Sequence, residues 1–192
     1  MNKENGIHSL NINENDINDL EDDLQKYFSI CKEKIGFIPN VLRSYSWNQK
    51  KLRYFSKFYN EIMLGESKLS ILEREMIALV VSSTNDCYYC QTAHGSAVRL
   101  ISKDKILSEV LSMNYRSANL SQRHLAMLNF STKLTLTPEQ IIDKDRNDLR
   151  ERGFTEEEIW DICEIVGFFN MTNRLASGIE MTPNKEYHNQ GR

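Results

Sequence analysis

The spacing of apolar residues between few helix breakers is the feature that most constrains the fold of this chain. Only three prolines and eight glycines occur among its 192 residues. Between them, apolar side chains recur at steps of three and four, which is the period of an amphipathic helix. No segment makes a convincing strand, so the sequence predicts an all-α fold.

Particular residues predict where the helices begin and end. We expect helices over residues 16–34, 41–47 and 49–64. Ser70 and Glu73 have the spacing of a capping box, in which each side chain accepts the other's backbone N–H. The helix that starts there is apolar nearly all round, which predicts a central, buried helix.

The helix after it should hold the residues from Cys87 to about Leu100, with Asn85 or Asp86 as its cap. Further starts are expected at Ser102, Ser121, Thr137 and Thr155, and Gly153 should end the helix before the last of these.

We predict one all-helical domain over residues 16–183, between a flexible N-terminal arm at 1–15 and a polar C-terminal tail at 184–192. The formal charge is −3 and the charges are spread along the chain, which argues against a nucleic-acid partner. No stretch is apolar enough for a membrane span. Four cysteines are too few for a secreted disulfide framework, so a cytoplasmic location is expected.

Cys87, Cys90 and His94 have the spacing of one helix face. Helical positions three apart have Cα atoms about 5 Å apart, within the roughly 4.4–6.8 Å of bridged cysteines. Glu75 lies in the buried central helix, where an unpaired carboxylate is costly, so a partner such as His94 is expected. Glu73 is the competing carboxylate, but the capping box already occupies it. This arrangement points to redox chemistry.

Two arguments compete over which cysteine is the reactive thiolate. The positive end of a helix acts most strongly in its first turn, which favours Cys87. An imidazole that accepts the thiol proton favours Cys90, one turn before His94. The spacing alone leaves both assignments open.

The pattern of Glu75, Cys87-Tyr88-Tyr89-Cys90 and His94 resembles the active-site pattern of the alkylhydroperoxidase D-like and carboxymuconolactone decarboxylase superfamily. Three further stretches resemble its uncharacterised peroxidase-related branch: Gly36-Phe-Ile-Pro-Asn40, Leu69-Ser-Ile-Leu-Glu-Arg-Glu75 and Phe168-Phe-Asn-Met-Thr-Asn-Arg174. The likeness covers roughly residues 36–183.

The resemblance implies an all-helical bundle that forms trimers or hexamers and reduces hydroperoxides without a cofactor such as haem or flavin. A thiol or dithiol reductant would be its partner. By the same resemblance, Cys90 attacks the peroxide and becomes a sulfenic acid, Cys87 resolves it as a disulfide, and His94 with Glu75 relays protons.

Tyr89 stands where the best-known members have a second histidine, so a relay through this position would have to use a phenol. The decarboxylases themselves lack the cysteine pair, so the resemblance does not extend to lactone decarboxylation. Asn173 and Arg174, in a matched stretch, either line the site or hold the last helix in place, and we expect the second role.

Two alternatives remain. Cys87, Cys90 and His94 are suitable zinc ligands, with Glu75 or water as the fourth, although structural zinc sites usually draw ligands from separate elements. A non-catalytic redox-sensing or partner-binding module would use the same scaffold and oxidise the cysteine pair without turnover.

Overall fold

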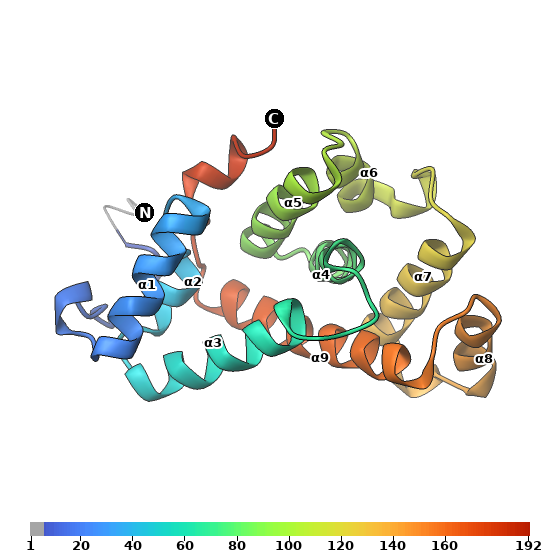
Figure 1. Cartoon of the computed structure of the whole chain (residues 1–192), viewed down its shortest axis with the longest axis horizontal. Helices are drawn as coiled ribbons and strands as arrows, with labels where there is room; N and C mark the ends of the chain where they lie inside the picture. Colours follow the sequence, from blue (N-terminus) through green and yellow to red (C-terminus); the bar gives the residue numbers. More distant parts are fainter. Residues whose placement is uncertain (1–5) are drawn as a thin grey trace.

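The computed structural model describes residues 6–192, and within this range the chain is helical with no strand (Figure 1). The all-α prediction is confirmed. The α-helices are α1 (Asp22–Ile35), α2 (Asn40–Tyr45), α3 (Gln49–Leu64), α4 (Ile71–Thr84), α5 (Tyr88–Ser102), α6 (Leu107–Asn114), α7 (Gln122–Leu136), α8 (Asp143–Glu151) and α9 (Glu156–Gly178). Short 3-10 turns lie at η1 (Ile17–Asp19), η2 (Tyr115–Ser117), η3 (Pro138–Gln140) and η4 (Lys185–His188).

Helix α4 is the centre of the bundle. It packs against α3, α5, α6, α7 and α9, and Figure 1 shows it end-on with these helices around it. Its ten consecutive residues 73–82 are all buried. An apolar surface on every side of a helix requires packing partners on every side, so the neighbours of α4 follow from its composition.

The N-termini of α4 and α9 are held together by one arginine. Ser70 and Glu73 form the predicted capping box of α4, and a second capping box starts α9 at Thr155 and Glu158. Arg123 of α7 donates to Glu73 at 3.2 Å and to Glu158 at 2.6 Å. The same guanidinium lies 3.6 Å over the ring of Phe154.

The predicted helix limits hold best where capping residues are strong. The predicted bounds 49–64 coincide with α3, and α7 and α9 begin directly after Ser121 and Thr155. The start expected at Ser102 is wrong. Asp104 accepts the backbone N–H groups of Ile106 and Leu107, and α6 begins at Leu107.

Two other predicted starts also differ from the structure. The helix expected from residue 16 is divided into η1 and α1, which begins at Asp22. The start at Thr137 gives only the single turn η3, and Asp143 begins the α-helix that follows.

The segments at both ends of the chain contact the domain. Of the arm predicted at residues 1–15, residues 1–5 lie outside the described part. Residues 7 and 9 exchange backbone hydrogen bonds with the loop after α9, through Thr182 N–H to Ile7 O and Ser9 N–H to Ile179 O. The segment predicted as a tail at 184–192 forms η4 and packs beside α5. None of the helices between residues 6 and 192 is both long and apolar enough to cross a membrane.

Replacing Arg123 with alanine should lower the free energy of unfolding by about 2 kcal/mol, because Glu73 and Glu158 would stay buried without their cation. Urea denaturation followed by circular dichroism measures this change. Arg146→Ala, which removes an exposed ion pair with Asp143, is the control and should leave the midpoint unchanged. Equal midpoints for the two variants would contradict the role given to Arg123.

Candidate active site

The turn between α4 and α5 fixes where the cysteines lie. Asn85 ends α4, and Asp86 adopts a left-handed backbone with φ of 51°. Cys87 is then the N-cap of α5, in place of the predicted Asn85 or Asp86, because Asp86 is used to reverse the chain. Cys90 follows in the first turn of α5 and His94 one turn later.

Glu75 and His94 form a buried hydrogen bond between α4 and α5. The carboxylate Oε2 lies 2.7 Å from the imidazole Nδ1, and the two residues are only 5% and 9% exposed. Glu73, the competing carboxylate, instead closes its capping box and pairs with Arg123. The contact holds the His94 ring by one nitrogen and leaves Nε2 available for chemistry.

Cys87 and Cys90 are buried, and their thiols are hydrogen-bonded to each other. The Cys90 thiol donates to the Cys87 sulfur and lowers the pKa of Cys87 to about 7, against the opposing effect of burial. The backbone N–H of Cys90, the Ser177 side chain and His94 lower it further. The same hydrogen bond, together with burial, raises the pKa of Cys90. The first negative charge therefore forms on Cys87.

Helix α9 supplies a further contact to the pair through Asn173. Its side-chain amide hydrogen-bonds Cys90 and donates to Ser82 Oγ at 3.0 Å. Its Oδ1 accepts from Asn85 Nδ2 at 2.9 Å. Asn173 thus lies at the site itself, whereas Arg174 is exposed and bonds Asn170 of its own helix.

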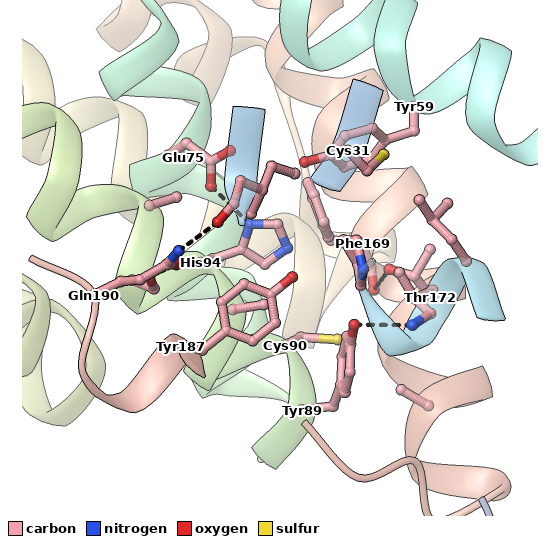
Figure 2. Close-up of a pocket in the computed structure, with 18 of the residues that line it drawn as sticks. Cys31, Tyr59, Glu75, Tyr89, Cys90, His94, Phe169, Thr172, Tyr187 and Gln190 are labelled. Atoms are coloured by element: carbon pink, nitrogen blue, oxygen red, sulfur yellow. Dashed lines mark hydrogen bonds and ion pairs between the residues drawn. The ribbon is translucent and has the colours of Figure 1, made fainter. Parts of the chain in front are cut away.

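Cys90, His94 and Glu75 lie on the wall of a cavity of about 290 Å³ (Figure 2). Most of its lining is apolar or aromatic. It comes from α1, Pro39 and the start of α2, α3, α5, α9 and the chain after α9, and includes Tyr27, Cys31, Pro39, Val41, Phe55, Tyr59, Ala93, Phe168, Phe169, Ala176 and Tyr187. Cys87 is not part of the lining. A molecule in the cavity would reach Cys90 first.

Comparison with known structures identifies the family. A crystal structure of an uncharacterized peroxidase-related protein from Silicibacter sp. TM1040 is 52% identical, covers 100% of both chains and superposes with a TM-score of 0.95. The chain belongs to the peroxidase-related branch of the alkylhydroperoxidase D-like superfamily. The resemblance stated from the sequence is confirmed at this level.

Other comparisons agree with this family. An uncharacterized peroxidase-related protein from Ralstonia eutropha JMP134, described as an alkylhydroperoxidase AhpD core, is 34% identical over 98% of both chains, with a TM-score of 0.93. The carboxymuconolactone decarboxylase family model matches residues 50–107. The debrominase Bmp8 shares the fold at 15% identity and a TM-score of 0.79, over 94% of this chain and 95% of its own. Among the curated proteins none matches.

Tyr89 lies between the two cysteines in the sequence and contacts α2 through its hydroxyl. Its side chain is 5% exposed and its hydroxyl accepts the backbone N–H of Val41 at 3.0 Å. Burial raises its pKa well above the ordinary value. The phenol therefore stays neutral, and it hydrogen-bonds Tyr187.

The remaining thiols of this family member differ from the cysteine pair. Burial raises the pKa of both Cys31 and Cys163. Cys31 lines the far part of the cavity beside Tyr27, and Cys163 is half-buried on α9. Across residues 6–192, no three His, Cys, Asp or Glu side chains are assembled in a way that could hold a metal ion.

Sequence reasoning missed Tyr187 and undervalued Asn173. Tyr187 stands in a short polar segment without helical periodicity, and its ring reaches the cavity only through the packing of η4. Asn173 occurs in a stretch that resembled the family, which was a usable signal. The local pattern nevertheless favours a structural role, since the contact with Cys90 joins two helices that are distant in the sequence.

Alkylation of Cys87 in the reduced protein should follow a midpoint near pH 7, since the thiolate is the reactive form and its pKa is lowered to about 7. Iodoacetamide labelling across pH, followed by peptide mass spectrometry, measures it. Cys90→Ala should move the midpoint up toward about 8.5, the ordinary cysteine value, because the donating thiol is lost. Cys90→Ser keeps a donor and should stay near the wild type. Identical midpoints for the alanine and serine variants would contradict the hydrogen bond as the main cause.

Proposed function

We propose that the protein is a thiol-dependent peroxidase that reduces hydroperoxides through the Cys87–Cys90 pair, with His94 and Glu75 as its proton relay. The observation that carries the proposal is the hydrogen-bonded dithiol whose Cys90 lines an apolar cavity beside a buried histidine–carboxylate pair. Membership of the peroxidase-related branch supports it.

The geometry supports different roles for the two sulfurs. Cys87 ionises first, but Cys90 lines the cavity, and the two share a hydrogen bond. Passage of the Cys90 proton to Cys87 along this bond places the negative charge on the sulfur that meets the substrate. The two thiols ionise as one coupled unit, so such an exchange is inexpensive.

The reaction then proceeds in two displacement steps. The Cys90 thiolate attacks one peroxide oxygen, an S–O bond forms, the O–O bond breaks, and the alcohol leaves with a proton from the relay. Cys87 now holds the proton that it received from Cys90, and it gives this proton to the departing hydroxide as its sulfur attacks the Cys90 sulfenic acid, which forms the disulfide and releases water. Two thiol hydrogens and one hydroperoxide thus give a disulfide, an alcohol and water. An external thiol or dithiol restores the pair.

The cavity supports an organic hydroperoxide as substrate. Its lining is chiefly aliphatic and aromatic, so an apolar group attached to the peroxide would be removed from water there. Hydrogen peroxide has no such group and would gain nothing from this lining.

Cys90→Ser should reduce peroxide consumption to the uncatalysed rate and abolish dimedone trapping of a sulfenic acid, because the attacking sulfur is lost. Cys87→Ser should still form the Cys90 sulfenic acid but accumulate it, since no resolving thiol remains. Cys163→Ser removes a thiol outside the cavity and is the matched control, expected to behave like the wild type. Stopped-flow consumption of cumene hydroperoxide and mass spectrometry follow these changes.

Two results would redirect this proposal. Undiminished turnover in Cys90→Ser would refute it. Reversible oxidation of the pair without turnover, whatever thiol donor is supplied, would favour a redox-sensing module that binds a partner in only one redox form.

We also propose that the chain forms a homo-oligomer, a trimer or hexamer as the family resemblance implies. Several large apolar side chains are exposed on the single chain, including Tyr54 and Phe58, one turn apart on α3 and 63% and 45% exposed. Light scattering coupled to size exclusion should give three or six times the chain mass. A single monomeric species at micromolar concentration would contradict it.

A further inference from the structure

The segment after α9 forms one wall of the cavity and is firmly fixed to α5. Buried Arg99 donates through Nε to Gln190 O at 3.0 Å and through Nη2 to Tyr187 O at 2.8 Å. Ser96 Oγ donates to Gln190 Oε1 at 2.9 Å. A buried arginine that binds two backbone carbonyls holds the main chain of this segment at a set distance from α5.

The Tyr187 side chain extends from this segment into the cavity. Its ring packs edge-on against Phe37, with centroids 4.9 Å apart, and against Tyr89, with centroids 6.5 Å apart. Figure 2 shows its hydroxyl pointing into the space that Cys90 and His94 line. The phenol is therefore placed where a substrate would meet the reactive sulfur.

Tyr89 stands beside Tyr187 on the same wall of the cavity. The Tyr89 oxygen accepts the Val41 N–H, which fixes the Tyr89 side chain, and each of the two phenols shifts the pKa of the other. A phenol has one proton to donate, and the Tyr187 hydroxyl, which points into the cavity, can donate it there.

We propose that Tyr187 is a catalytic residue that donates a hydrogen bond to the leaving oxygen of the hydroperoxide, and that Tyr89 is the positioning residue that orients it. The proposal rests on the proposed peroxidase function. As the Cys90–oxygen bond forms and the O–O bond breaks, negative charge develops on the departing oxygen, and a prearranged donor stabilises it. Tyr187 keeps its proton, and the alcohol takes the one that the thiol pair released through His94.

Burial supports this assignment, since it raises the pKa of Tyr187 and keeps the phenol protonated through the range in which Cys87 ionises. A neutral, buried donor acts without a change of charge.

The test compares oxidants whose leaving groups differ in basicity. Reduced protein is oxidised in a single turnover by tert-butyl hydroperoxide, which must expel a strongly basic alkoxide, or by peracetic acid, which expels the weakly basic acetate. Tyr187→Phe keeps the ring contacts with Phe37 and removes only the hydroxyl. It should slow the first reaction about 100-fold, as for loss of one such donor, and the second far less.

Two further variants make the result specific. Tyr89→Phe should give a smaller loss with the same dependence on the leaving group, because Tyr187 loses its orientation. Tyr88→Phe removes an exposed hydroxyl 3.3 Å from His188 Nε2 of the same segment and should react like the wild type with both oxidants. Thermal unfolding checks that each variant is folded.

The outcomes separate the two proposals. A wild type that reacts with neither oxidant refutes the peroxidase function itself. A reactive wild type, with Tyr187→Phe either unimpaired or impaired equally toward both oxidants, refutes the role of Tyr187 alone. Selective loss with the alkyl hydroperoxide, in Tyr187→Phe and more weakly in Tyr89→Phe, supports it.

Discussion

The buried contact between Glu75 and His94 is the interaction on which the site depends. A carboxyl group inside the central buried helix α4 is costly unless it is hydrogen-bonded. His94 Nδ1, on α5, lies 2.7 Å from Glu75 Oε2 and supplies this hydrogen bond. The contact also fixes how far α5 is shifted along α4. The cysteines of the first turn of α5 are consequently set against α9 and the cavity by the same contact. Removing the pair would disturb the dithiol as well as the relay.

In the dithiol, the cysteine that ionises first is not the cysteine that faces the cavity. The sulfur that most easily becomes an anion, Cys87, is the one shielded from the cavity, and the sulfur that faces the cavity holds its proton more tightly. The pKa of Cys87 is lowered chiefly by the hydrogen bond from the Cys90 thiol and further by the backbone N–H of Cys90, whereas of the two cysteines only Cys90 lines the cavity. A resting pair of this kind keeps its negative charge away from adventitious electrophiles in the cavity.

Local patterns in the sequence were enough to predict much of the fold and part of the site. The capping boxes at Ser70 and Thr155 and the helical period located α4 and α9, and the three- and four-residue steps placed Cys87, Cys90 and His94 on one face. The failures lie where one local signal competes with another. Thr137 followed by proline starts a turn, but that turn ends after three residues.

Contacts between distant segments could not be predicted in this way. Asn173 reaches Cys90 from α9, and Tyr187 reaches the cavity because Arg99 holds its backbone. Neither contact leaves a periodic trace in the sequence, since each depends on how whole helices are placed in the bundle. These are the residues by which the site differs from a bare cysteine–histidine motif.

The shared arginine at the start of α4 and α9 has a consequence for how the chain can vary in length. Because Arg123 binds both Glu73 and Glu158, it fixes the N-termini of α4 and α9 relative to each other. Asn173 lies fifteen residues beyond Glu158, a rise of about 22 Å, and each residue inserted or deleted between them would turn it by about 100° around the helix axis. Insertions are therefore tolerable in the loops but not within this stretch of α9. A single inserted residue there would rotate the Asn173 amide away from Cys90, although the contacts of Arg123 with Glu73 and Glu158 would stay intact.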